Sequence, residues 1–463
     1  MNNRKVIVIG LDCGTPQLIF DQYKKDLPNI SAMMEQGTWG RLKSTIPPIT
    51  IPAWACMTTS KTPGDLGVYG FRSRTPGAPY DAMDIAHAGL IKEKRIWDYL
   101  GDAGKKVGML GVPQTYPVKP VNGMMVSSFM TPSTKEEFAY PAELKQEILD
   151  MVAPDDYIFD FANRSAEPPE QVLEKIYTMT DQRQKIFKHW IRNKEWDFLM
   201  MVEMGVDRIH HYLWQYMDPT HKDYEAGNPF ENKIREYYMH IDAFIGEVRE
   251  MAPADTVIYV VSDHGAKRMD GMFVINEWLI ENGYLVLKEF PKEPTSINAC
   301  DVDWSKTKAW AWGGFYGRLF LNIKGREQQG IVDPADADAL LDELRSKLME
   351  VKGPNGEEMK HLLVKPGELY ADGRGDSPDL MIFWGDLYYK LAGTLGYNSL
   401  YIEKDDRGLD FGVHDWYGVY LRHDPKAKGL GEKDGLSILD ITPTWLNDFG
   451  MDVPGDMRGT IIE

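Results

Sequence analysis

Two aspartates and a histidine stand directly after apolar runs that are typical of buried strands. Asp12 follows the run Val6–Leu11. Asp263 and His264 follow the run Val257–Ser262. The carboxyl ends of strands in an open α/β sheet are where ligands bind. Charged residues there are costly to desolvate unless a partner such as a metal ion is present, although a helix cap or a hydrogen-bonded loop start is the structural alternative.

A second group of candidate ligands begins with Asp207 and His211, which follow the apolar run Phe198–Val202. Their spacing of four residues places both side chains on one face of a helix, where they can hold one ion. His210 lies one residue closer and competes for the same role. His414 stands alone before another apolar stretch, and by itself also fits an ordinary core or surface histidine.

Thr50 is the candidate nucleophile, and it lies in the proline-rich segment Ile46–Trp54. The prolines hold the backbone extended and then begin a helix at Pro52. Threonine is well suited to cap a helix at its N-terminus. The same position places the hydroxyl where backbone N–H groups favour an anion such as phosphate. These two interpretations are compatible, and residues elsewhere must decide between them.

Short apolar runs alternate with longer helical patterns, which predicts an α/β fold with a mostly parallel sheet buried between helices. Strands are expected at Val6–Leu11, Lys106–Leu110, Phe198–Val202, Thr256–Val261 and Leu380–Trp384. Helices are expected at Gln17–Glu35, Arg95–Ala103, Glu143–Met151, Pro168–Asn193, Ile234–Met251 and Ala335–Val351.

The chain is expected to form a single catalytic domain over residues 1–463. Residues from about 131 to 194 are rich in charge and helical pattern, and we expect a helical cap insertion there. A polar stretch without a clear period follows at about 290–306. Beyond it, residues from about 308 to 385 are expected to form a small β-α-β addition.

The composition excludes several classes of protein. The 463 residues include 70 acidic and 52 basic ones, a net charge of −18, which argues against a nucleic-acid polymer as partner. No apolar run approaches about 18 residues, so no membrane span is expected. The three cysteines form no disulfide framework, and the N-terminus does not resemble a signal peptide, so we expect a cytoplasmic protein. The sequence does not indicate an oligomeric state.

The motifs, taken together and in order, resemble the alkaline phosphatase superfamily, most closely its type I phosphodiesterase/nucleotide pyrophosphatase-like branch. The segments that carry the resemblance are Gly10–Asp12, Pro47–Trp54, Thr62–Gly64, Asp207 to His211, Ser262–Gly265, Gly412–His414, Asp440–Trp445, Pro454 and Met457–Gly459. The resemblance implies that superfamily's fold, a three-layer α/β sandwich with a mostly parallel central sheet, helices on both faces and cap or insert segments.

The resemblance also implies roles for these residues. It assigns one divalent ion to Asp207, His211 and His414, and a second to Asp12, Asp263 and His264, with Thr50 completing its shell. Oxygen and imidazole ligands suit zinc, and manganese or iron also fit. Thr50 would attack phosphorus and form a phosphothreonine, with both metals stabilising the entering and leaving oxygens. The implied activity is hydrolysis of phosphate esters, of phosphodiesterase or nucleotide pyrophosphatase type, on a small phosphorylated substrate.

One departure concerns the group that contacts the phosphoryl oxygen. Nucleotide pyrophosphatases have an asparagine some way after the nucleophile, whereas the segment Leu66–Arg72 contains none. Arg72 or Arg74 is the candidate substitute, because a guanidinium suits a more charged phosphoryl group. Both also fit ordinary loop arginines. Cys13 stands where relatives tend to have glycine.

Other functions on the same scaffold stay open. A phosphomonoesterase, a phosphomutase and a phosphonate hydrolase share the metals. A sulfatase requires cysteine or serine at the nucleophile position and arginine four residues on, where this chain has Thr50 and Trp54. From a different class, a non-catalytic, metal-stabilised binding protein would have no need of Thr50.

Overall fold

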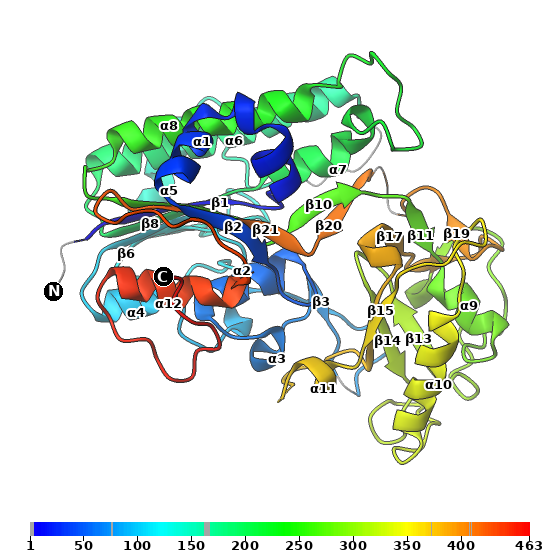
Figure 1. Cartoon of the computed structure of the whole chain (residues 1–463). Coiled ribbons are helices and arrows are strands. Elements are labelled where there is room, and N and C mark those ends of the chain that lie inside the picture. The colour runs from blue at the N-terminus through cyan, green and yellow to red at the C-terminus, as the bar shows by residue number, and fades with distance from the viewer. Residues whose placement is uncertain (1–3, 76, 162–166, 372, 407, 409) are drawn as a thin grey trace.

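The first strand, β1 (Val6–Leu11), is buried on both faces, and its alternate side chains enter two separate cores. Ile7 and Ile9 join one core, whereas Val6 and Val8 join the other. Because side chains alternate between the faces of a strand, a strand without a polar face must lie between two helical layers. The computed structural model shows this arrangement in Figure 1. It describes residues 4–75, 77–161, 167–371, 373–406, 408 and 410–463.

One ten-stranded sheet runs through the larger part of the molecule. Besides β1 it contains β2 (Thr38–Lys43), β5 (Val107–Leu110), β6 (Gly123–Val126), β7 (Ala139–Tyr140), β8 (Phe198–Glu203), β9 (Val257–Val261), β21 (Tyr417–His423), β22 (Gly431–Glu432) and β23 (Leu436–Ser437). The order is β22-β2-β21-β9-β1-β8-β5-β6-β7, with β23 beside β2. The strands from β9 to β6 are parallel, and β21 and β7 are antiparallel to their neighbours.

Helices cover both faces of this sheet. The helices on one face are α1 (Pro28–Gln36), α5 (Glu143–Val152), α6 (Pro169–Asn193), α7 (Gly205–Met217) and α8 (Lys233–Met251). The helices on the other are α2 (Thr50–Thr59), α4 (Ile96–Asp102) and α12 (Ile441–Asp448). The predicted three-layer α/β sandwich with a mostly parallel sheet is therefore confirmed (Figure 1). Within the described residues, no helix combines the length and apolar character that a membrane crossing needs.

The single helix predicted over Gln17–Glu35 is wrong. The structure has two short helical segments, η1 (Gln17–Gln22) and η2 (Lys24–Asp26), and α1 begins separately at Pro28. Proline lacks a backbone N–H and is tolerated in the first turn of a helix, not in its interior. The apolar periodicity continues across Pro28, which is why the pattern alone predicted one helix.

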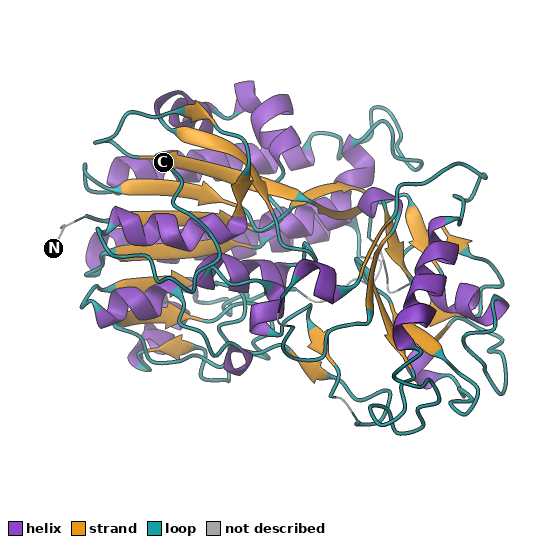
Figure 2. Cartoon of the chain, turned by 60° about the horizontal axis from the view of Figure 1, so that its bottom comes forward, coloured by secondary structure: helices purple, strands orange, loops and turns teal. Residues whose placement is uncertain are grey.

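A smaller lobe lies beside the larger body in Figure 2 and spans the chain from β11 (Gly271–Phe273) to β19 (Tyr401–Ile402). It has its own apolar core. Its main elements are α9 (Ile275–Glu281), β13 (Ala309–Trp312), β14 (Gly317–Leu321), α10 (Ala337–Met349), β15 (Leu362–Val364) and β16 (Leu380–Phe383). The four strands β13-β14-β16-β15 pair antiparallel. The division of the chain into a catalytic domain, a cap and an addition stays a prediction.

Short elements complete the fold. They are α3 (Pro63–Leu66), β3 (Arg72–Ser73), β4 (Asp84–Ile85), η3 (Ala88–Leu90), β12 (Thr295–Ser296), η4 (Ile297–Ala299), α11 (Pro366–Leu369), η5 (Gly385–Leu387), β17 (Tyr389–Leu391), β18 (Thr394–Leu395) and η6 (Ile438–Asp440). Two further strands, β10 (Gly265–Arg268) and β20 (Gly412–Asp415), pair antiparallel where the sheet meets the smaller lobe.

Candidate active site

Three neighbouring parallel strands bring most of the candidate ligands together at the carboxyl ends of the strands. Asp12 follows β1 and Asp263 follows β9, which pairs with β1. On the other side of β1, strand β8 leads into α7, whose first turns carry Asp207 and His211. The pairing of β10 with β20 sets His414 opposite Ala266, just after His264 in the chain. Residues far apart in sequence therefore meet because their strands are adjacent.

The first cluster consists of Asp207, His211 and His414, all buried. Asp207 Oδ1 lies 3.1 Å from His211 Nε2 and 3.7 Å from His414 Nε2. The other ring nitrogen of His211, Nδ1, lies 2.7 Å from Asp410 Oδ1. Burial opposes the charged imidazole, but Asp410 and Asp207 outweigh it and raise the pKa of His211 to about 9. An outer carboxylate on a ligating histidine fixes its tautomer and its orientation.

The second cluster consists of Asp12, Asp263 and His264, and each is completely buried. His264 Nε2 lies 3.1 Å from Asp263 Oδ2 and 3.9 Å from Asp12 Oδ1. Trp54, one turn into α2, donates its indole N–H to Asp12 Oδ2 at 2.7 Å. This bond orients the Asp12 carboxylate and leaves its second oxygen facing the cluster.

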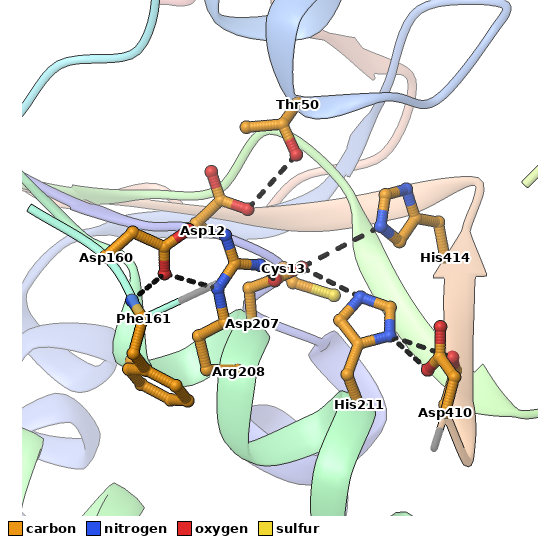
Figure 3. A network of polar contacts seen from close by, with 12 residues as sticks. Asp12, Cys13, Thr50, Asp160, Phe161, Asp207, Arg208, His211, Asp410 and His414 are labelled. Carbon is orange, nitrogen blue, oxygen red and sulfur yellow. Dashed lines mark hydrogen bonds and ion pairs between the residues drawn. The ribbon is translucent and has the colours of Figure 1, made fainter. Parts of the chain in front are cut away.

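Thr50 is the first residue of α2 and faces the second cluster (Figure 3). Its Oγ1 lies 3.5 Å from Asp12 Oδ1 and 3.3 Å from His264 Nε2. The side chain makes no capping bond to its own helix, since the N-cap position belongs to Ile49. The hydroxyl is therefore directed at the site rather than used as a cap, which separates the two roles that the sequence left open.

The two clusters adjoin each other, because the His264 and His414 rings stack with centroids 3.8 Å apart. Within each cluster the candidate ligand atoms lie within 4.8 Å of one another. Burial and the carboxylates of Asp263 and Asp207 raise the pKa of Asp12 well above its usual range. Asp263 Oδ2 is buried, and although it lies 3.1 Å from His264 Nε2, the described residues offer it no hydrogen bond of good geometry. Buried carboxylates and imidazoles with such an unsatisfied oxygen fit a site for divalent cations.

Cys13 follows Asp12 in the left-handed region, with φ at 63°. Glycine adopts this conformation most readily, so a cysteine here is unusual. The Cys13 thiol donates to the carbonyl of Gly265 at 3.2 Å. Its sulfur also lies within 4.8 Å of nitrogens of His264 and His414.

His210, which competes with His211 on sequence spacing, points elsewhere. Its Nε2 lies 3.1 Å from the hydroxyl of Tyr238, on α8. Burial lowers the pKa of His210 to about 3. It is a neutral core histidine, and the structure brings His211 rather than His210 to the cluster.

A cleft of about 400 Å³ lies over Thr50, His211 and His414. Both the larger body and the smaller lobe line it. Its aromatic lining consists of Phe71, Phe129, Phe161, Tyr212, Phe315 and Tyr316, and its basic lining of Arg72, Arg208, Arg318 and Lys390. Of the described residues in the region expected to form a cap, 131–161 and 167–194, Asp160 and Phe161 line the cleft, whereas α5 and α6 pack on the sheet.

The two arginines expected to contact substrate lie in different places. Arg72 is exposed and lines the cleft. Arg74 is buried, and its guanidinium lies 2.9 Å from both Glu327 and Asp376. The structure therefore does not bring Arg74 to the cleft, and its charge is used to join two loops.

Replacing Arg74 with alanine is expected to lower the free energy of unfolding by about 3 kcal/mol or more, because a buried carboxylate loses its partner. The same change at exposed Arg72 is expected to alter it by less than about 0.5 kcal/mol. Urea denaturation of the two variants measures the difference. Similar values for both would contradict the structural role of Arg74.

Sequence reasoning missed several polar residues of the site, among them Asp160, Arg208 and Asp410. Arg208 adjoins Asp207, and its place in the first turn of α7 was the available signal. Asp160 and Asp410 stand outside any motif, in loops whose positions depend on the packing of other elements. No local pattern identifies them.

Comparison with known proteins fits this geometry. The family model described as type I phosphodiesterase / nucleotide pyrophosphatase matches residues 6–412. The chain belongs to this family. The match includes every candidate ligand except His414, which lies two residues beyond it. No curated protein sequence matches the chain.

Solved structures of the family's fold are similar over nearly the whole chain. Human ectonucleotide pyrophosphatase/phosphodiesterase 5 has a TM-score of 0.58 at 12% identity, covering 99% of this chain and 97% of that one. The murine protein in an inactive form in complex with AMP has a TM-score of 0.56 at 12% identity, covering 98% and 97%. Phosphonoacetate hydrolase from Sinorhizobium meliloti 1021 in complex with phosphonoformate has a TM-score of 0.60 at 15% identity, covering 95% and 94%. At these identities the likeness shows the fold.

Proposed function

We propose that this protein is a metal-dependent phosphohydrolase acting on phosphate esters, of the phosphodiesterase/nucleotide pyrophosphatase type, with Thr50 as its nucleophile. The observation that carries the proposal is the placement of the Thr50 hydroxyl beside two adjoining buried clusters of ligand residues. Family membership supports the reaction class. A non-catalytic binding protein would not require a hydroxyl in this place.

Asp207, His211 and His414 would hold one divalent ion, and Asp12, Asp263 and His264 the other. When bound, such ions favour the Thr50 alkoxide and stabilise charge on the entering and leaving oxygens. Zinc fits the oxygen and imidazole donors, and manganese and iron are the alternatives.

Thr50 Oγ1 would form a bond to phosphorus as the bond from phosphorus to the leaving alcohol breaks, giving a phosphothreonine. Water would then attack phosphorus and release the phosphate product, and the Thr50 hydroxyl would regain its proton. The start of α2 supports this chemistry, because N–H groups at a helix N-terminus favour an anionic group. Positioning and charge stabilisation supply most of phosphoryl-transfer catalysis, so no side-chain general base is required.

A phosphonate hydrolase is the second candidate. One solved structure with the same fold is a phosphonoacetate hydrolase. The cleft also presents a guanidinium, Arg208, which suits a doubly charged phosphoryl group. A phosphomonoesterase or a phosphomutase would use the same Thr50 chemistry on a dianion.

A paired assay tests the proposal. We expect metal-reconstituted protein to hydrolyse bis(4-nitrophenyl) phosphate, with 4-nitrophenyl phosphate and phosphonoacetate measured in parallel. Faster turnover of the monoester would favour a monoesterase or mutase, and phosphate release from phosphonoacetate would favour the second candidate. Absence of turnover with every substrate would contradict the proposed hydrolase.

We also propose a cytoplasmic location, which rests on cysteine usage. The chain has three cysteines, and Cys13 and Cys56 are buried and unpaired. Proteins of oxidising compartments commonly pair their cysteines.

A further inference from the structure

The cleft contains the guanidinium of Arg208, which takes no part in making or breaking the bonds to phosphorus. Arg208 follows the candidate ligand Asp207 in α7, and it lines the same cleft as Thr50. Its side chain is 16% exposed, so it is largely withdrawn from solvent yet open to the cleft. An arginine in such a place is costly to desolvate unless its charge is used.

Asp160 fixes the orientation of this guanidinium (Figure 3). Arg208 Nε donates to Asp160 Oδ1 at 2.8 Å, and Nη2 donates to Asp160 Oδ2 at 2.7 Å. Nη1 contacts Asp207 Oδ2. A bidentate pair of this kind sets the plane of the guanidinium, and Nη1 and Nη2 each keep a second N–H. Asp160 therefore fixes the orientation in which the Arg208 guanidinium reaches the cleft.

The charge of Arg208 is maintained by its surroundings. Arginine keeps its positive charge in proteins, and Asp160 and Asp207 both pair with this guanidinium. Arg208 lines the same cleft as Thr50, whose hydroxyl approaches Asp12. A positive group close to the nucleophile and inside a cleft is arranged to meet a negative charge.

Arg72, the cleft arginine that the sequence analysis singled out, is less suitable. Arg72 is exposed, and no ion pair to a described residue fixes its guanidinium. Arg208 approaches from α7, a different element, and can contact a phosphoryl oxygen with a fixed donor.

We propose that Arg208 binds a non-bridging oxygen of the phosphoryl group and that Asp160 positions it, so that this pair contributes more to turnover of doubly charged phosphoryl groups, in phosphate monoesters and phosphonates, than to turnover of singly charged diesters. The inference rests on the proposed function. A diester has one negative charge on its non-bridging oxygens, whereas a monoester dianion has two. Loss of the guanidinium therefore harms the dianion more.

The decisive variant is Arg208→Gln, assayed with 4-nitrophenyl phosphate and bis(4-nitrophenyl) phosphate. We expect kcat/KM to fall by about 10²–10³-fold for the monoester, as when a preorganised donor is removed, and by about 10-fold for the diester. Metal content per chain should match that of the unaltered protein. Arg192→Gln, which removes an exposed arginine near the end of α6, is the matched control and should change neither rate.

Two further variants separate binding from folding. Arg208→Lys keeps a charge but loses the bidentate pair, and Asp160→Asn keeps the size of the side chain but weakens the positioning of Arg208. Both variants are expected to lower the ratio of monoester to diester kcat/KM by about 10-fold. The thermal midpoint of the Asp160→Asn protein should stay within a few degrees of that of the unaltered protein. They keep the proposal testable if Arg208→Gln does not fold.

Direct binding gives a readout that is independent of turnover. In a Thr50→Ala background, adding Arg208→Gln should raise the dissociation constant for inorganic phosphate by about 10-fold or more in calorimetry. Equal losses for both esters would overturn the inference, as would loss of metal without loss of phosphate binding, because Arg208 would then act on Asp207 alone. Failure of the unaltered protein to hydrolyse any ester would instead overturn the proposed function, while the phosphate titration still tests Arg208.

Discussion

The Thr50→Ala variant is expected to lower kcat for ester hydrolysis by about 10⁴-fold or more while keeping the fold and the bound metal. Thr50 Oγ1 is the hydroxyl placed against Asp12 and His264, and no bond of the helix depends on it. Removing it deletes the attacking atom without leaving a helix end uncapped. Steady-state kinetics on metal-reconstituted protein, with metal analysis and circular dichroism, measures each part of this prediction.

Two control variants belong with it. Thr50→Ser retains the hydroxyl and should keep activity within about 10-fold, because serine serves the same chemistry. Thr59→Ala removes a buried hydroxyl from the same helix, where it donates to the carbonyl of Ala55 at 2.8 Å. That variant should lose about 1 kcal/mol of stability and retain its kcat. If Thr50→Ala kept most of its activity, the covalent mechanism would be wrong.

Replacing a candidate ligand of one cluster is expected to have the second large effect, on both metal content and kcat. Asp263→Ala or His264→Ala is expected to lower the metal content from two ions to one per chain and kcat by about 10³-fold, since each ion supplies several kcal/mol and 1.36 kcal/mol corresponds to tenfold. Asp207→Ala or His211→Ala should remove the other ion. Metal analysis after gel filtration in metal-free buffer measures the stoichiometry.

A buried aspartate outside the clusters provides the control. Asp242, on α8, accepts backbone N–H groups of Asn29 at 3.1 Å and Ile30 at 2.7 Å, and so anchors the start of α1. Asp242→Asn is expected to lower stability but to leave two ions bound, because it touches no candidate ligand. Two ions in the Asp263→Ala protein would show that the ligand assignment is incorrect.

The sequence predicted the layered architecture because its strands have no polar face. A run such as Val6–Leu11 requires burial on both sides, and the alternating helical patterns supply the two layers. The antiparallel strands β2 and β21 were not predicted. Buried residues alternate with less buried ones along β2 but not along β21, and most of the chain separates the two strands. The pairing of β2 with β21 depends on contacts between segments that are far apart in the sequence, so a pattern within a short segment does not reveal it.

The candidate ligand residues were also predictable from the sequence. Asp12, Asp207 and Asp263 each closely follow a buried strand, so the sheet itself carries them to a common edge. The sequence shows locally that a residue follows a strand. In a parallel sheet the carboxyl ends of neighbouring strands lie together, so residues that follow those strands come close to one another. The structure brings together all seven residues that were expected to form the metal and nucleophile site.

Only the tertiary structure decided which charged groups serve the cleft. Arg72 and Arg74 stand two residues apart, yet one is exposed at the cleft and the other is buried against Glu327 and Asp376. Arg208 owes its orientation to Asp160, which is 48 residues away and in a loop between helices. Residue type and spacing fix what a side chain can do. Segments that are distant in the chain determine how deeply the side chain is buried and which group it pairs with. Burial and pairing in turn determine whether the charge stabilises the fold or can bind a substrate.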